Sequence, residues 1–179
     1  GGIQAIQTLW AGPWMLNISG YTPLQSATGL FWINITMLIS YFIWGYILPK
    51  ISDYGINSIK LIKLGLPISY FSLFLIIYFG NNAGAFLFTI YIMTSIVISL
   101  TQPAIALNFS KNLAGKSLTS FNVFLFSGTF FIQWGIGLVI DLCNNNGFDI
   151  VSSYRISFSV FLILCVLSCL LYTSPSPRD

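Results

Sequence analysis

The chain has 179 residues, of which 56% are hydrophobic and 6% are charged, with a formal net charge of +3. Soluble globular domains carry roughly 25% charged residues, so the composition excludes an ordinary soluble domain. The sequence contains no His and no Glu, which argues against zinc chemistry and against catalysis by a Ser-His-Asp triad or a carboxylate pair. We therefore expect no enzyme, no metal and no cofactor. The few lysines do not form a nucleic-acid-binding surface.

Six apolar segments follow one another along the chain. They cover about residues 3–18, 27–48, 58–79, 84–107 and 118–141, and the sixth begins near Ser153. A membrane-spanning helix needs about 20 mostly apolar residues, which the middle segments supply. Gly, Asn and Pro form turn signals between segments at residues 17–23, 80–84 and 144–147. The sequence thus predicts an all-α, polytopic membrane protein with six transmembrane helices.

Both ends of the sequence have features that indicate a fragment. The chain begins without Met inside an apolar segment. Residues 169–179, CLLYTSPSPRD, match the peptide that one reading frame of a common transposase sequencing adapter encodes. We therefore expect residues 1–168 to be the transmembrane bundle, with its first helix truncated, and residues 169–179 to be derived from the adapter. A natural tail rich in Ser and Pro is the alternative.

Lysines gather in alternate loops of this predicted bundle. The loops after the second and fourth segments hold Lys50, Lys60, Lys63, Lys111 and Lys116. The other loops, with the start of the sixth segment, hold Asp141, Asp149 and Arg155, so that Arg155 is their one basic residue. Loops rich in Lys and Arg face the cytoplasm, so the lysine-bearing loops are predicted to be cytoplasmic. Chance segregation of so few charges is the alternative.

Amide side chains recur on single faces of four predicted helices. Asn122, Thr129 and Gln133 fall on one stripe, because residues 7 and 11 apart share a helix face. Comparable stripes hold Gln4, Gln7 and Trp14 in the first segment, Asn34 and Tyr41 in the second, and Tyr91 and Gln102 in the fourth, where Pro103 predicts a kink. Lipid cannot satisfy an amide, so these faces must meet protein or water. Hydrogen bonds between helices explain any one residue, and the set favours a shared cavity.

Three stretches resemble bacterial major facilitator superfamily transporters. Residues 112–141, NLAGKSLTSFNVFLFSGTFFIQWGIGLVID, are similar to the tenth loop and eleventh helix of that family, with Lys116 where Arg is usual. Residues 7–14, QTLWAGPW, resemble its seventh helix. Residues 45–56, GYILPKISDYGI, resemble its cytoplasmic loop motif G-x-x-x-D-R-x-G, which Gly45, Lys50 and Gly55 match while Pro49 replaces the acid.

The resemblance implies the C-terminal six-helix half of a twelve-helix transporter. In that architecture helices seven, eight, ten and eleven surround a central cavity, and these are the helices with amide stripes here. The implied function is secondary active transport of a small organic solute by alternating access. The implied partners are the lipid bilayer, the missing N-terminal half and the solute, with or without a coupling proton or ion. The implied location is the bacterial inner membrane.

The candidate residues follow from the stripes and the resemblance together. The predicted cavity lining is Gln7, Trp14, Asn34, Tyr41, Tyr91, Gln102, Asn122 and Gln133. Gly128 and Gly135 are expected to allow close helix packing, and Gly45, Lys50, Gly55 and Lys116 to belong to the cytoplasmic loops. The alternatives are a membrane protein with a structural or interaction role, a channel, and a polytopic membrane enzyme.

Overall fold

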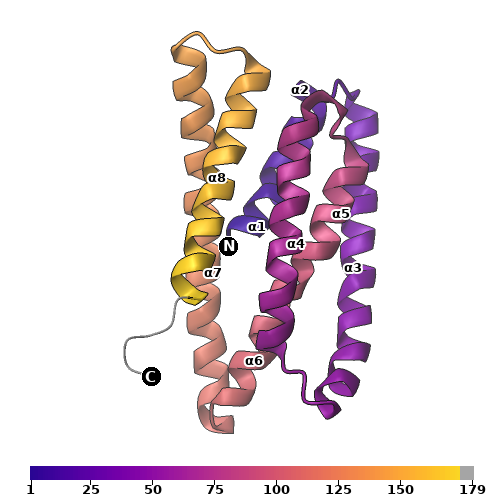
Figure 1. The fold of residues 1–179 in the computed structure, drawn as a ribbon, viewed down its shortest axis with the longest axis vertical. Helices are drawn as coiled ribbons and strands as arrows, with labels where there is room; N and C mark the ends of the chain where they lie inside the picture. Colours follow the sequence, from indigo (N-terminus) through magenta and orange to yellow (C-terminus); the bar gives the residue numbers. More distant parts are fainter. Residues whose placement is uncertain (174–179) are drawn as a thin grey trace.

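The computed structural model describes residues 1–173, with side chains to residue 170, and these residues form helices joined by short turns (Figure 1). The first helix, residues 2–17, comprises α1 (Gly2–Ala5), a π-helical turn (Ile6–Trp10) and α2 (Ala11–Asn17). Next come α3 (Pro23–Asp53), α4 (Ser58–Phe79) and a 3₁₀ turn (Gly80–Asn82). The broken helix, residues 85–108, comprises α5 (Ala85–Ser95), a 3₁₀ turn (Ile96–Leu100) and α6 (Thr101–Asn108). The last two are α7 (Lys111–Asn145) and α8 (Ile150–Thr173).

The prediction of an all-helical chain is confirmed for the described residues, among which no strand occurs. Five helical units are long and apolar enough to cross a membrane: Pro23–Asp53, Ser58–Asn82, Ala85–Asn108, Lys111–Asn145 and Ile150–Leu170. The first helix, at residues 2–17, is shorter than these five. Residues 169–173, expected to come from an adapter, continue α8, and residues 174–179 lie outside the described residues.

Local sequence explains where α3 begins and ends. Thr22 accepts a hydrogen bond from the backbone N–H of Gln25, and the Gln25 side chain accepts one from the Thr22 N–H, which together make a capping box. Pro23 occupies the first turn, where a missing N–H costs nothing. After the helix, Gly55 adopts a φ of 75°, a left-handed conformation that favours Gly. Gly55 of the predicted loop motif therefore has a conformational role.

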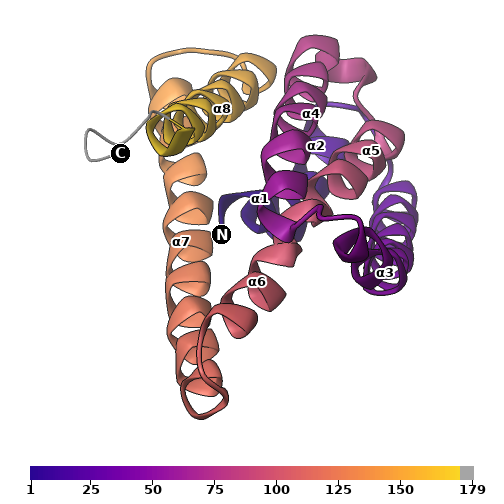
Figure 2. The same cartoon turned by 60° about the horizontal axis from the view of Figure 1, so that its bottom comes forward.

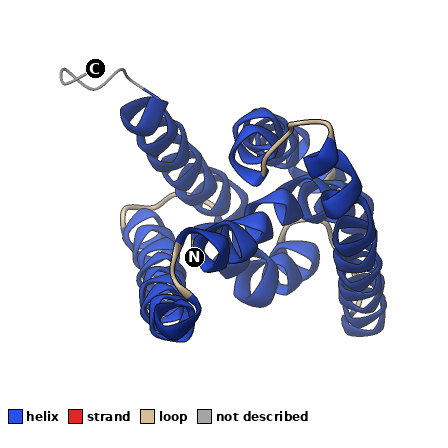
Figure 3. Cartoon of the chain, turned by 90° about the horizontal axis from the view of Figure 1, so that it is seen from below, coloured by secondary structure: helices blue, strands red, loops and turns tan. Residues whose placement is uncertain are grey.

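The first helix is the centre of the packing. It contacts α3, α7 and α8, while α5 packs between α3 and α4, and α8 packs on α7 and α4 (Figures 2 and 3). Trp14 of the first helix is fully buried, with its ring centroid 4.7 Å from that of Phe158 and 6.2 Å from that of Phe88. Aromatic pairs at such separations stabilise a core beyond their buried area.

The outer helices expose large apolar side chains. Phe42 on α3 is 72% exposed, and Leu64 on α4 is 70% exposed. Soluble monomers rarely expose contiguous apolar patches of more than a few hundred Å². Exposed aromatic and aliphatic residues on helices of this length are typical of segments that contact lipid.

The turns whose flanking helix ends carry the lysines lie at one end of the bundle. The turns at residues 54–57 and 109–110 are both at the lower end in Figure 1, and those at residues 18–22, 83–84 and 146–149 are at the upper end. Lys50, Lys60, Lys63, Lys111 and Lys116 therefore lie near the lower end. The alternation of lysine-rich and lysine-poor loops along the sequence thus places all the lysines near one end of the bundle.

Candidate functional site

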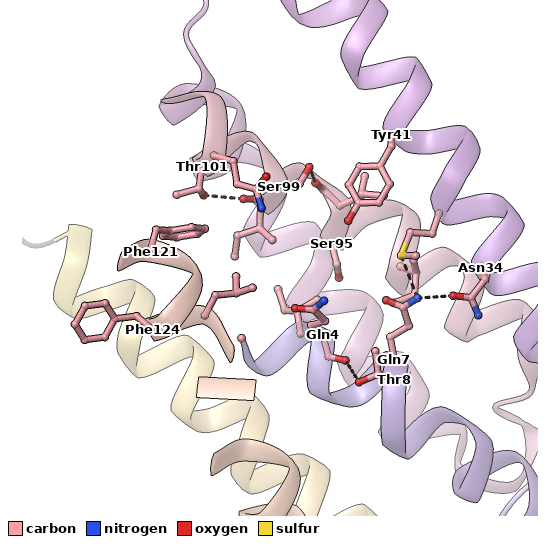
Figure 4. Close-up of a pocket in the computed structure, with 18 residues that line it drawn as sticks. Gln4, Gln7, Thr8, Asn34, Tyr41, Ser95, Ser99, Thr101, Phe121 and Phe124 are labelled. Atoms are coloured by element: carbon pink, nitrogen blue, oxygen red, sulfur yellow. Dashed lines mark hydrogen bonds between the residues drawn. The ribbon is translucent and has the colours of Figure 1, made fainter. Parts of the chain in front are cut away.

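A cavity of about 560 Å³ lies between the first helix, α3, the broken helix and α7 (Figure 4). Its polar lining consists of Gln4, Gln7, Thr8, Asn34, Tyr41, Ser95, Ser99, Thr101 and Gln102. Its other lining residues are Gly1, Ile3, Met37, Ile92, Ile96, Ile98, Phe121, Phe124 and Leu125. No charged side chain of the described residues lines it. The cavity is thus lined by neutral polar side chains together with apolar and aromatic ones.

The π-helical turn of the first helix forms one wall. Gln7 Nε2 donates a hydrogen bond to Asn34 Oδ1 of α3 at 3.2 Å and lies 3.1 Å from Met37 Sδ. The next residue, Thr8, accepts a hydrogen bond from Gln133 Nε2 of α7 at 2.9 Å. Neighbouring residues of one turn therefore bridge two helices on opposite sides of the first helix. π-Helical turns often occur at functional sites.

Pro103 explains how the broken helix presents its polar residues. Proline has no N–H, and its ring clashes with the carbonyl four residues earlier, which here belongs to Ser99. The chain accordingly adopts a 3₁₀ turn over Ile96–Leu100, where the sequence predicted a kink. The Ser99 hydroxyl donates to Ile96 O at 2.7 Å, and the Thr101 hydroxyl donates to Ile98 O at 2.6 Å. Both hydroxyl groups therefore donate to backbone oxygens of their own helix and not into the cavity.

Three lining side chains keep their polar atoms free. The amides of Gln4 and Gln102 and the hydroxyl of Tyr41 make no hydrogen bond to other described residues, and all three side chains are exposed. Each amide offers two donors and one acceptor. Phe121 and Phe124 border the same cavity on the side opposite Gln7 (Figure 4). The available chemistry is therefore neutral hydrogen bonding beside apolar ring surfaces.

Four of the eight predicted cavity residues line this cavity: Gln7, Asn34, Tyr41 and Gln102. Trp14 and Tyr91 lie instead in the core, fully buried, and Trp14 Nε1 and Tyr91 Oη have no hydrogen-bond partner among the described residues. Helical spacing gives the face of a residue but not its depth, and the Trp14 ring lies against the rings of Phe88, Tyr154 and Phe158.

The stripe on α7 faces the first helix. Gln133 donates to Thr8, and Thr129 Oγ1 donates to Gly1 O at 3.1 Å as well as to Leu125 O at 2.9 Å. Asn122 is half-buried and does not belong to the cavity lining. The reading that amides hold neighbouring helices together thus describes Gln133 better than a position in the cavity wall does.

The structure adds cavity residues that are absent from the predicted lining. Gln4, Thr8, Ser99, Thr101, Phe121 and Phe124 line the cavity. The sequence had already placed Gln4 on one stripe with Gln7, although the predicted cavity lining did not include it. Ser99 and Thr101 were not predicted, because a 3₁₀ turn shifts the helical period that places side chains on a face.

The predicted packing and loop residues occupy varied positions. A Cβ on Gly128 would lie 3.9 Å from Gly1 Cα, where the first helix approaches α7. Gly135 borders a small apolar cavity of about 140 Å³ between α7 and α8, and a Cβ there would meet nothing within 4 Å. Lys50 Nζ donates to Tyr46 Oη and lies 3.8 Å from the centroid of that ring. Gly45 and Lys116 are exposed on α3 and α7.

The turn before α8 holds a carboxylate with a lowered pKa. A hydrogen bond from Ser152, through its side chain and its backbone N–H, holds the pKa of exposed Asp149 below its usual value. The Ser152 N–H lies 3.1 Å from Asp149 Oδ2. This contact satisfies a free N–H in the first turn of α8.

No protein-family model, curated protein or solved structure matches the chain. The class of protein is therefore defined by the fold and the site. The protein is a helical bundle with five segments long and apolar enough to cross a membrane, and its helices border a cavity lined by neutral polar and apolar side chains.

Proposed function

We propose that the chain is the solute-binding part of a secondary transporter in a bacterial inner membrane, as the resemblance to the C-terminal half of major facilitator transporters implies. In this proposal an N-terminal six-helix half completes the cavity. The two halves rock about the site and expose it alternately to each side of the bilayer. The cargo is a small organic solute.

The observation that carries the proposal is the placement of the free amides. Gln4 and Gln102 have no partner among the described residues, yet they border a cavity in a bundle whose outer surface is apolar. Polar groups at membrane depth are costly and usually mark a pathway for ions or solutes. A cavity of about 560 Å³ lies within the range of ordinary small-molecule sites.

The geometry also supports a way for the cavity to change shape. The first helix is tied to α3 through Gln7 and to α7 through Thr8. The broken helix changes helical type beside the cavity, at Ile96–Leu100. Such turns lack part of the regular α-helical hydrogen-bond ladder, so they bend at lower cost than an intact helix.

A membrane protein with a structural role, and no transport, is the second candidate. The hydrogen bonds of Gln7 with Asn34 and of Gln133 with Thr8 favour it, because both join neighbouring helices. The two candidates differ in what they require of Gln102, which makes no hydrogen bond to other described residues. A purely structural role does not explain why the Gln102 side chain lies beside the cavity without joining two helices.

Uptake measurements separate the two candidates. Cells that express the complete gene are incubated with radiolabelled sugars, nucleosides, amino acids and carboxylates in turn, and the uptake of each compound is measured. The expected result is uptake of at least one compound above that of cells carrying an empty vector. Gln102→Leu should reduce that uptake, and Phe42→Leu on the exposed face of α3 should not. Absence of uptake for every compound contradicts the transport proposal.

A further inference from the structure

We infer that the solute group bound by this cavity is uncharged, and that Gln4, Gln102 and Tyr41 recognise it through neutral hydrogen bonds while Phe121 and Phe124 contact its apolar face. The inference rests on the proposed transport function and deepens it by naming the chemical class of the cargo. It is an uncharged solute with several hydroxyl or amide groups and a flat or hydrocarbon side, such as a neutral sugar or a nucleoside.

The absence of charged side chains in the described lining carries the first step. Every polar residue there is Gln, Asn, Ser, Thr or Tyr. An ion that leaves water for a site of low dielectric needs an opposite charge nearby, because dipoles alone seldom replace its hydration. A charged solute group would find no such partner among these side chains.

The hydrogen bonds of the lining side chains show which polar atoms remain available to a ligand. Asn34 donates to Leu30 O at 2.7 Å and accepts from Gln7. Thr8 donates to Gln4 O at 2.8 Å and accepts from Gln133. These side chains have protein partners already. The amides of Gln4 and Gln102 and the phenol of Tyr41 remain available for a ligand.

The shape of the lining carries the third step. The free amides come from the first helix and the broken helix, whereas Phe121 and Phe124 come from α7 (Figure 4). A solute in the cavity meets donors and acceptors from the first helix and the broken helix and ring surfaces from α7. Amides both donate and accept, which suits hydroxyl and carbonyl groups, and aromatic rings suit flat or C–H-bearing faces.

The local electrostatic potential of the cavity tests this inference directly. The chain is prepared with Cys143, Cys165 and Cys169 replaced by Ser, and with Gly1 joined to a preceding tag peptide so that its nitrogen is an uncharged amide. A Gln102→Cys variant is reconstituted into phosphatidylcholine vesicles. Its reaction rates with a cationic trimethylammonium methanethiosulfonate and with an anionic sulfonate methanethiosulfonate are measured and compared with those of free cysteine.

The inference predicts that the ratio of the two rates at residue 102 lies within about threefold of the ratio for free cysteine. A charged group about 8 Å away would shift the ratio by more than roughly tenfold. Asn112→Cys is the positive control, because Lys111 and Lys116 lie on the same helix and should favour the anionic reagent. A bias above tenfold at residue 102, or no reaction there while residue 112 reacts, overturns the inference.

The uptake panel keeps failure of the inference distinct from failure of the proposed function. Uptake of sugars or nucleosides, but not of amino acids or carboxylates, agrees with both. Uptake of charged compounds alone supports transport and overturns the inference. If no compound enters the cells, the transport proposal fails, and the rate ratio at residue 102 alone decides whether the cavity is electrically neutral.

Discussion

Gln133 on α7 donates a hydrogen bond to Thr8 in the first helix at 2.9 Å, across 125 residues of sequence. Trp10 Nε1 donates to the backbone oxygen of the same Gln133 at 3.2 Å. Two hydrogen bonds therefore join the π-helical turn to α7 at one residue. This relationship assigns Gln133 to helix packing, whereas Gln102 remains free beside the cavity.

Gln133→Leu should destabilise the bundle, while Gln102→Leu should not. The first change removes the bond to Thr8, and side-chain bonds between membrane helices contribute about 0.6 kcal/mol on average. The second removes an amide with no partner among the described residues. Thermal unfolding in detergent, monitored by circular dichroism, gives the comparison. Equal melting temperatures for both variants would contradict the assignment of Gln133.

Gly29→Ala should destabilise the contact between α3 and the residues that face it. A Cβ at this position would lie 2.9 Å from Ala85 Cβ and 3.0 Å from Met15 Sδ. Overpacking of this kind costs about 1–3 kcal/mol. Unfolding in detergent measures the loss as a lower melting temperature.

Gly45→Ala is the matched control on the same helix. A Cβ there meets nothing within 4 Å, and Ala is favoured over Gly in a helix by about 0.5–1 kcal/mol. This variant should be at least as stable as the parent. A melting temperature that falls equally for both glycines would show that the contact at Gly29 is not the cause.

Thiol labelling should place the two ends of the bundle on opposite sides of the membrane. Asn112→Cys lies near the lysine-bearing end and Asn145→Cys near the other, both exposed. With the native cysteines replaced, an impermeant maleimide should label residue 145 in intact cells and residue 112 only after permeabilisation. The reverse pattern would overturn the cytoplasmic placement of the lysine-bearing end.

Acid should weaken the start of α8 through Asp149. The folded pKa of this carboxyl is lower than its usual value, so its ionised form is favoured by folding. The stabilisation is present above the ordinary pKa of Asp, about 3.9, and is lost as the pH falls through the lowered value. The melting temperature of the parent should therefore drop more over this range than that of Asp149→Asn. If the melting temperatures of the two proteins depended on pH identically, the Asp149 carboxylate would not contribute to stability in this way.

The sequence predicted the helices well because their signals are local. Apolar length identifies a helix, and Gly, Asn and Pro mark where it ends, as at residues 80–84. The α7 helix nevertheless starts at Lys111, well before the predicted residue 118, because no Pro interrupts this stretch and Gly115 alone does not end the helix. The helix propensities of residues 111–117 are compatible with this longer helix, whereas hydropathy placed its start at residue 118.

The candidate site was only partly predictable, because helical spacing does not say which neighbour a face meets. Gln7 and Trp14 share a stripe, yet Gln7 borders the cavity and Trp14 packs against Phe158. Ser99 escaped notice because the 3₁₀ turn before Pro103 alters the period. Depth in the core and changes of helical type arise from tertiary packing, which a stripe along one helix cannot encode.

Collision measurements on spin labels in lipid bilayers test the central claim most directly, namely that water and solute reach the amides of the cavity. A nitroxide is attached at residue 102 in one variant and at residue 42 on the exposed face of α3 in another. We predict that the label at residue 102 collides mainly with a water-soluble nickel chelate and the label at residue 42 mainly with oxygen, which concentrates in lipid. Oxygen-dominated collisions at both positions would contradict a water-filled cavity.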